Sequence, residues 1–162
     1  MAAGGSVLYS KPCEYAIRAL TFLAGAPDRQ PAQAKELARA ENIPAPVLAK
    51  ILQELARKGL LRSRRGPGGG FSLARRPEMI TMRDVVAAID GLEHFHRCVA
   101  GLENCGEEAP CPLHQSWKVI RGQILHDLET TTLAQMALAV ARKKAVVRRA
   151  RRADASWRRA KK

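Results

Sequence analysis

Three cysteines and one histidine lie within seventeen residues in the second half of the chain, namely Cys98, Cys105, Cys111 and His114. Soft thiolates together with an imidazole can complete a tetrahedral metal site. The gaps of six and five residues between the cysteines are wider than the spacing typical of zinc fingers. The spacing therefore favours a wider metal cluster over a single zinc ion, while a zinc site and a chance group of free thiols stay open as alternatives.

The rest of the sequence indicates the compartment in which such a site operates. No run approaches the ~18 to 20 apolar residues of a membrane span, because Glu14 and Arg18 interrupt the first apolar segment and Arg121 and Asp127 the last. Residues 1–12 lack a charged region followed by an apolar core, so we expect no secretion signal. We therefore expect a cytoplasmic protein without a membrane partner, in which clustered cysteines indicate metal ligation or redox chemistry rather than disulfides.

The residues around the cysteines predict an ordered loop and then a long helix. Residues 92–112 contain Gly and Pro and show no sustained apolar period, so this segment, the cysteine loop, needs a ligand to hold it. From Leu113 onward, apolar side chains recur every three or four residues, at Trp117, Ile120, Ile124 and Leu128. This stripe predicts a long amphipathic helix whose apolar face needs a packing partner.

The first half of the chain predicts three helices and then a hairpin. Apolar side chains at helical spacing place the helices at residues 12–25, 33–41 and 45–59. Two short extended segments, at 60–64 and 71–73, flank a glycine-rich turn. A further short helix is capped by Thr81 and ends at Gly91. This order predicts a mainly α fold with a small β-hairpin wing, that is, a winged helix-turn-helix.

A winged helix of this kind is suited to duplex DNA, because its third helix enters the major groove and the hairpin tip reaches the minor groove. The tip needs Gly where the backbone approaches phosphates and Arg where cations face the groove. We expect DNA contacts from Lys50 on the third helix and, in the hairpin, from Arg62, Arg64, Arg65, Gly68 and Gly69. The alternatives are a loose hairpin turn and a phosphate-binding enzyme loop, and no Gly-Lys-Ser/Thr follows to support the latter.

Most of the positive charge lies at the C-terminal end of the chain. The formal net charge is +13, and residues 142–162 contribute +10 of it through eleven Lys or Arg and one Asp. Two interpretations stay open: an arm that clamps duplex DNA, and a solvated end that aids solubility. Elsewhere, beyond the cysteine loop, we find no activated nucleophile or acid–base pair, so we expect neither an enzyme nor a small-molecule substrate.

Three motifs together resemble the Rrf2 family of winged-helix transcriptional regulators. They are Tyr-Ala-Ile-Arg-Ala-Leu at residues 15–20, Arg-Gly-Pro-Gly-Gly-Gly-Phe-Ser-Leu-Ala at 65–74, and Cys-Pro-Leu-His-x-x-Trp at 111–117, preceded by two further cysteines. The resemblance covers residues 8–140. It implies a homodimer whose long helices pair, an iron-sulfur cluster on the three thiolates, and binding to double-stranded promoter DNA that is governed by the state of the cluster.

The implied protein is a repressor that senses redox conditions, nitric oxide or iron-sulfur status, and we expect a 2Fe-2S rather than a 4Fe-4S cluster. His114 matches the fourth ligand of IscR-like members, whereas Glu14 matches the carboxylate that NsrR-like members donate from the other subunit. We favour His114. We interpret Cys13 as a small buried apolar residue rather than a ligand. The gap of six residues before Cys105 and the basic tail depart from the family pattern.

The predicted organisation has four parts. Residues 1–90 form the DNA-binding domain, 91–112 the cluster-binding loop, 113–140 the dimerisation helix region, and 141–162 a basic tail. The main alternative function is a cluster-free or zinc-binding protein that uses this tail for sequence-independent binding to nucleic acid.

Overall fold

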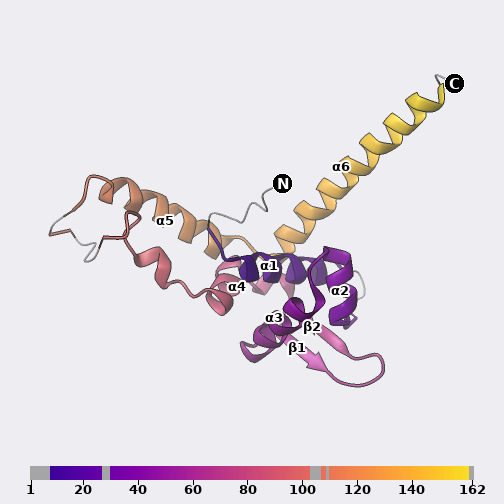
Figure 1. Ribbon diagram of the computed structural model, residues 1–162, viewed down its shortest axis with the longest axis horizontal. Helices are drawn as coiled ribbons and strands as arrows, with labels where there is room; N and C mark the ends of the chain where they lie inside the picture. The colour runs from indigo at the N-terminus through magenta and orange to yellow at the C-terminus, as the bar shows by residue number, and fades with distance from the viewer. Residues whose placement is uncertain (1–7, 27–29, 103–106, 109, 161–162) are drawn as a thin grey trace.

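The helices and the hairpin follow the order that the sequence predicts (Figure 1). The computed structural model describes residues 8–26, 30–102, 107–108 and 110–160, with side chains as far as residue 150. Its main elements are α1 (Lys11–Ala24), α2 (Ala34–Glu41), α3 (Ala45–Arg57), β1 (Leu61–Arg64), β2 (Gly70–Leu73), α4 (Met82–Ile89), α5 (His114–Thr130) and α6 (Leu133–Ala160). This mainly helical architecture with a small hairpin confirms the predicted fold class.

Local capping explains where the first helices begin and end. The Ser10 hydroxyl accepts a hydrogen bond from the backbone N–H of Cys13, at 3.2 Å, and so caps α1. The carboxylate of Glu36 accepts a hydrogen bond of 3.0 Å from the backbone N–H of Gln33, at the start of α2. Asn42 ends α2 in a left-handed conformation with φ of 50°. Asn tolerates this conformation better than most residues, so the chain can turn sharply into α3.

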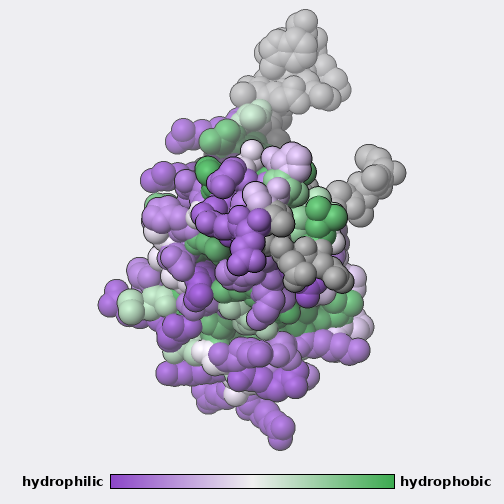
Figure 2. All heavy atoms as spheres, turned by 90° about the vertical axis from the view of Figure 1, so that its left-hand side faces the viewer, coloured by the Kyte–Doolittle hydropathy of each residue, from purple (hydrophilic) through white to green (hydrophobic). Residues whose placement is uncertain are grey.

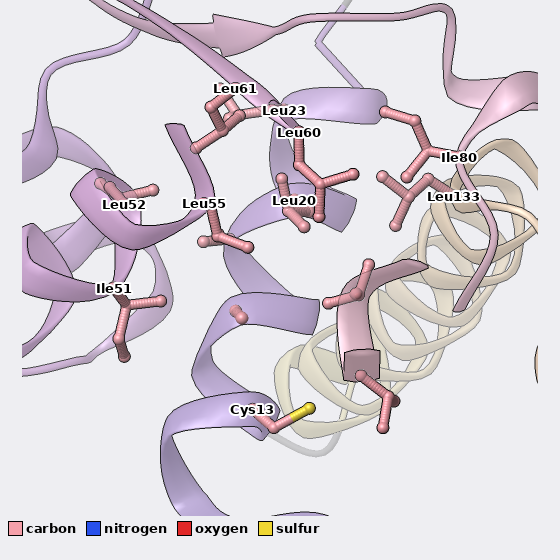
Figure 3. Packing of buried hydrophobic residues seen from close by; sticks show 14 of the residues in the cluster. Cys13, Leu20, Leu23, Ile51, Leu52, Leu55, Leu60, Leu61, Ile80 and Leu133 are labelled. Atoms are coloured by element: carbon pink, nitrogen blue, oxygen red, sulfur yellow. The ribbon is translucent and has the colours of Figure 1, made fainter. Parts of the chain in front are cut away.

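The core forms where α1 passes between α3, the base of the hairpin and α6 (Figure 3). Leu20 and Leu23 of α1 lie among apolar side chains from these elements, namely Leu52, Leu55, Leu60, Leu61, Ile80 and Leu133. All of them are buried. Because Leu128 and Leu133 belong to this core, the C-terminal helices help to complete the winged helix rather than merely following it.

The hairpin is anchored to the segment before α2. Strands β1 and β2 are antiparallel, with Leu61 opposite Leu73 and Arg64 opposite Gly70. Ala32 and Phe71 exchange two backbone hydrogen bonds of 2.9 Å, which extend the ladder by one bridge. Strand β2 is therefore paired on both sides, with β1 and with Ala32, while the tip of the turn stays exposed.

A short junction connects α5 and α6 to the start of α4. The backbone N–H of Met82 donates to the carbonyl of Thr131 at 2.8 Å, and that of Leu133 donates to the carbonyl of Ile80 at 2.9 Å. The predicted cap of α4 is confirmed, because Thr81 and Asp84 each accept a hydrogen bond from the backbone N–H of the other. The kink between α5 and α6 is thus fixed against the winged helix.

From this junction the two long helices leave in different directions (Figure 1). Helix α5 carries the cysteine loop at its far end, and α6 extends on the side away from the hairpin. The basic tail continues α6 without a break to Ala160, giving a helix of 28 residues. Among the described residues, we find no helix with both the length and the apolar character needed to cross a membrane.

Candidate functional site

The cationic side chains predicted to contact DNA lie on one face of the protein. Helix α3 and the hairpin occupy the same end of the molecule (Figure 1). Lys50 on α3 and the three arginines of the hairpin, Arg62, Arg64 and Arg65, are all exposed. In the part of the chain that the structure describes, none of these four side chains forms an ion pair. Their charges are therefore available to an anionic partner.

The two glycines predicted to approach phosphates differ in their surroundings. Gly68 is exposed and has a φ of +70°, which favours glycine at the tip of the turn. Gly69 is buried, and a Cβ at this position would lie 2.3 Å from the carbonyl oxygen of Arg64. Gly69 is thus required for the turn to close on β1, whereas Gly68 lies where a partner can approach its backbone.

A second group of arginines, close to the hairpin, is partly neutralised. A cavity of about 320 Å³ is lined by Arg62 together with Arg75 and Arg76, which follow β2. Arg75 forms an ion pair of 3.4 Å with Asp84, and Arg76 one of 3.5 Å with Glu78. The cavity therefore adds positive charge beside the wing, although two of its three arginines already have acidic neighbours.

The cysteine loop is held at the start of α5. Trp117, in the first turn of α5, donates a hydrogen bond of 2.9 Å from its indole Nε1 to the carbonyl oxygen of Arg97. Because Cys98 follows Arg97 directly, this bond brings Cys98 to the helix turn that begins with His114. Cys98 and His114 are both buried, at 9% and 7% exposure, in a loop that is otherwise mostly exposed.

Further contacts shape both ends of this loop. The backbone N–H of His114 donates to the carbonyl of Cys111 at 2.9 Å, which closes a tight turn between these two predicted ligands. The N–H of Gly101 donates to the carbonyl of Cys98 at 3.0 Å. The ammonium group of Lys118 on α5 forms an ion pair with Glu107, and its hydrogen bond, and then its positive charge, lower the pKa of the Glu107 carboxyl. The loop thus folds back along the first turns of α5.

The structure therefore gathers two thiols and an imidazole at one end of α5, without showing a completed site. Cys105 lies outside the described residues. Among the residues that are described, no three His, Cys, Asp or Glu side chains are close enough together to hold one metal ion. The donor types still suit an iron-sulfur cluster or zinc, because thiolates and imidazole ligate both.

Glu14 lies on α1, away from the turn of α5 that carries His114. It forms ion pairs with Lys11 at 2.9 Å and Arg18 at 3.8 Å, and it borders a groove of about 430 Å³ between α1, α5 and α6. The groove meets α5 at Ile124 and beyond, which is at least ten residues, or about 15 Å of helix, from His114. Glu14 is therefore well separated from His114 of its own chain along α5.

The remaining described cysteine belongs to the core of the winged helix. Cys13 is fully buried on α1 beside Asp90, whose carboxylate also accepts hydrogen bonds from the backbone N–H and the hydroxyl of Ser10. Burial, and then the negative charge of Asp90, raise the pKa of the Cys13 thiol to about 12. This thiol stays protonated at neutral pH, which is unfavourable for metal ligation.

Apolar side chains are exposed on α5 and on the cysteine loop. On the long helix α5, the side chain of Val119 is 72% exposed and that of Ile120 is 52% exposed. Val99, Leu102 and Leu113 of the loop region are also more than half exposed. Figure 2 looks onto this end of the molecule and shows apolar patches that interrupt the polar surface. Exposed apolar patches of this kind are typical of surfaces that bind another molecule.

Comparisons with known proteins agree with this architecture. Residues 9–139 match the family model Rrf2, described as an iron-dependent transcriptional regulator. An HTH-type transcriptional regulator of Aquifex aeolicus (strain VF5) is 34% identical over 132 residues, which cover 80% of this chain and 91% of that protein.

Two solved structures are similar as well. CymR, the global cysteine regulator of B. subtilis, gives a TM-score of 0.68 at 25% identity and covers 80% of this chain and 95% of its own. IscR of T. potens gives a TM-score of 0.66 at 25% identity, covering 86% and 91%. With its winged helix, its exposed cationic face and a family match over most of its length, this chain belongs to the Rrf2 family of DNA-binding transcriptional regulators, which are not enzymes.

Proposed function

We propose that this regulator is a cytoplasmic, homodimeric repressor whose promoter binding is controlled by an iron-sulfur cluster. The ligands are Cys98, Cys105, Cys111 and His114. The observation that carries the proposal is the hydrogen bond from Trp117 to Arg97, since it holds the Cys98 segment against the helix turn that carries His114. When bound, a cluster supplies one-electron redox chemistry and a target for nitric oxide or oxygen.

The donor set and its surroundings support a cluster at this position. Burial of Cys98 and His114 limits access of water to the ligands, and burial is one of the features that set the potential of an iron-sulfur site. The close turn between Cys111 and His114 brings their backbones together at the start of α5. A ligand bound by both ends of the loop would add to the contacts that already hold it there.

Dimerisation through α5 explains its exposed apolar side chains and the groove beside α1. Soluble oligomers are mostly two-fold symmetric, and two α5 helices that pack antiparallel place the start of one beside the end of the other. The end of α5 borders the groove that contains Glu14. The same packing therefore brings Glu14 of the partner subunit toward the cysteine loop, where it is the alternative to His114 as fourth ligand.

The DNA contacts that we propose are Lys50 in the major groove and Arg62, Arg64, Arg65, Gly68 and Gly69 at the wing, where Gly69 also allows the turn to close on β1. Contacts between α5 and α4 offer a route by which the cysteine loop can influence the winged helix. Helix α5 runs from the loop to Thr131, whose carbonyl accepts the hydrogen bond from Met82 at the start of α4. Arg83 and Glu129 add an ion pair of 3.3 Å across the same junction. A change in the loop that shifts α5 therefore acts directly on the base of the wing.

The experiment is an anaerobic purification of the full chain, followed by visible and paramagnetic resonance spectra and by analysis of iron, sulfide and zinc. We expect a coloured protein with iron and sulfide in equal amounts, and a change in promoter affinity when the cluster is removed. Promoter fragments selected from genomic DNA by the protein itself serve as the ligand. A colourless protein that holds zinc or no metal would support the cluster-free alternative instead.

Single substitutions in the loop sharpen this test. Cys98→Ala, Cys105→Ala and Cys111→Ala should each abolish the visible absorbance and leave the winged helix folded. Cys13→Ala is the matched control, because it removes a cysteine that packs in the core and should retain the chromophore. An intact chromophore in any of the three loop variants would remove that residue from the site.

A further inference from the structure

The last turns of α6 form a basic arm that the family pattern does not account for. The family match ends at residue 139, whereas α6 continues to Ala160. We define the basic arm as residues 142–160, which contain nine Lys or Arg and one Asp. At 1.5 Å per residue the arm is about 28 Å long. It therefore offers an extended, strongly positive surface.

As far as side chains are described, the charged side chains of the arm lie outside the core. The start of α6 packs on the body of the protein through Leu133 in the core, and Val140 and Lys144 line a cavity beside Thr21 and Phe22 of α1. The described cations after Val140 are all exposed, namely Arg142, Lys143, Lys144, Arg148 and Arg149. As far as side chains are described, none of the five takes part in an ion pair. These charges are therefore ready for an external polyanion.

The direction of the arm determines which polyanion it can reach. Helix α3 and the hairpin lie at one end of the winged helix, and α6 leaves the molecule on the opposite side (Figure 1). A continuous α-helix cannot bend back on itself without a break. The arm consequently points away from the duplex segment that the wing of the same subunit contacts.

We propose that the basic arm binds a second segment of duplex DNA, so that one regulator joins two segments. Duplex DNA carries one negative charge per about 1.7 Å of its length, which matches a run of closely spaced cations. The contacts go to phosphates and carry no sequence information, so the second segment is bound regardless of its sequence. The arm acts alongside the DNA-binding activity of the winged helix and does not depend on the cluster.

A bridging assay tests this proposal directly. A biotinylated duplex is fixed to beads, the full-length protein is added, and capture of a second, fluorescent random-sequence duplex is measured as a function of salt. The test variant combines Arg142→Gln, Lys143→Gln, Lys144→Gln, Arg148→Gln and Arg149→Gln, because Gln keeps the helix propensity and removes the charge. Circular dichroism checks that the variant is folded. Arg65→Ala serves as the control that weakens the other DNA-binding face.

The full-length protein should capture the second duplex, and the five-Gln variant should bind the first duplex but capture much less of the second. Each neutralised phosphate contributes about 0.9 to the slope of log affinity against log salt, so the slope for capture should fall by roughly four units. Equal capture by the variant would overturn the proposal. A full-length protein that never bridges, while the variant loses affinity for a single duplex, would show instead that the arm clamps the duplex read by the wing. Binding to phosphatidylserine vesicles in the absence of any bridging would identify a membrane surface as the partner and would equally reject it.

Discussion

The indole Nε1 of Trp117 and the carbonyl oxygen of Arg97 lie 2.9 Å apart, and this hydrogen bond joins α5 to the residue that precedes Cys98. Trp117 belongs to the segment Cys-Pro-Leu-His-x-x-Trp, so one motif carries a thiol, an imidazole and the group that positions a second thiol. Trp117 is therefore a positioning residue for the cysteine loop as well as an anchor on the helix.

Substitution of Trp117 by Phe should shorten the lifetime of the cluster without abolishing its assembly. An aromatic ring stays in place, but the loop loses one hydrogen bond, which is worth about 1 kcal/mol. The equilibrium constant for opening of the loop should therefore rise about fivefold. The measurement is the rate at which visible absorbance decays in the presence of a chelator. Trp157→Phe, which changes the other tryptophan of the chain, should decay like the parent. If Trp117→Phe also decays like the parent, this bond has no role in holding the cluster.

His114→Ala and Glu14→Ala should have different effects on the spectrum. We expect the His114 variant to give a shifted or labile chromophore, since the imidazole is buried at the loop. The Glu14 variant should give little change, because Lys11 and Arg18 already neutralise this carboxylate. The opposite result would assign the fourth ligand to Glu14 of the partner subunit. If neither spectrum changes, the fourth ligand lies elsewhere.

Arg65→Ala should weaken promoter binding and leave the iron content unchanged. The side chain is exposed at the tip of the hairpin, on the opposite side of the winged helix from α6. Loss of one phosphate contact should lower the slope of log affinity against log salt by about 0.9. Arg65→Lys is the matched control, because it keeps the charge and should keep most of this slope. Equal binding by Arg65→Ala and the parent would contradict the assignment of the wing.

Gly69→Ala should destabilise the hairpin more than Gly68→Ala does. A Cβ at Gly69 would collide with the Arg64 carbonyl, whereas one at Gly68 meets nothing within 4 Å and only strains a φ of +70°. The free energy of unfolding of the Gly68 variant should fall by about 1 to 2 kcal/mol, because alanine is strained in the left-handed conformation. That of the Gly69 variant should fall further. Denaturant unfolding of both proteins measures the difference. A smaller loss at Gly69 would show that β1 moves aside at little cost.

The Cys13 thiol should resist alkylation at pH 8, since its pKa is raised to about 12 and little thiolate is present. In the cluster-free protein, iodoacetamide should therefore modify the half-buried Cys111 before Cys13, as peptide mass spectrometry can show. The same pKa makes stability depend on pH. The folded protein holds this proton more tightly than the unfolded chain, so its contribution is complete below pH 9 and declines as the pH rises toward 12. Cys13→Ala should remove this part of the decline, and equal pH profiles would contradict the raised pKa.

The elements that could be predicted from the sequence are those with a strong local pattern. Apolar spacing identified α1 and α3 almost to the residue, and the glycine-rich turn identified the hairpin. Thr81 and Asp84 formed the expected cap. These features depend on residues close together in the chain, so the sequence contains most of the information needed.

Features that depend on distant residues were not predictable in the same way. The hydrogen bond between Trp117 and Arg97 spans twenty residues, and neither side-chain type indicates which partner it will bind. The close approach of Gly69 to the carbonyl of Arg64 depends on the exact path of the turn, which the glycine-rich sequence does not specify. The sequence of the tail, rich in Arg and Ala, gave no sign of where α6 would point, because that direction is set by the packing of Leu133 and the junction at Ile80.

The junction between α5, α6 and α4 also determines which fragments and fusion proteins of this chain can fold. Leu133 is completely buried against the core formed by the first ninety residues, and its backbone bonds to Ile80. A fragment that ends near residue 90 would expose this apolar surface and leave the carbonyl of Ile80 without its donor. The smallest unit that can fold and bind DNA on its own therefore combines the winged helix with the start of α6, two segments that are far apart in the sequence. A fusion that borrows it has to include the chain through the first turns of α6, and with it the cysteine loop.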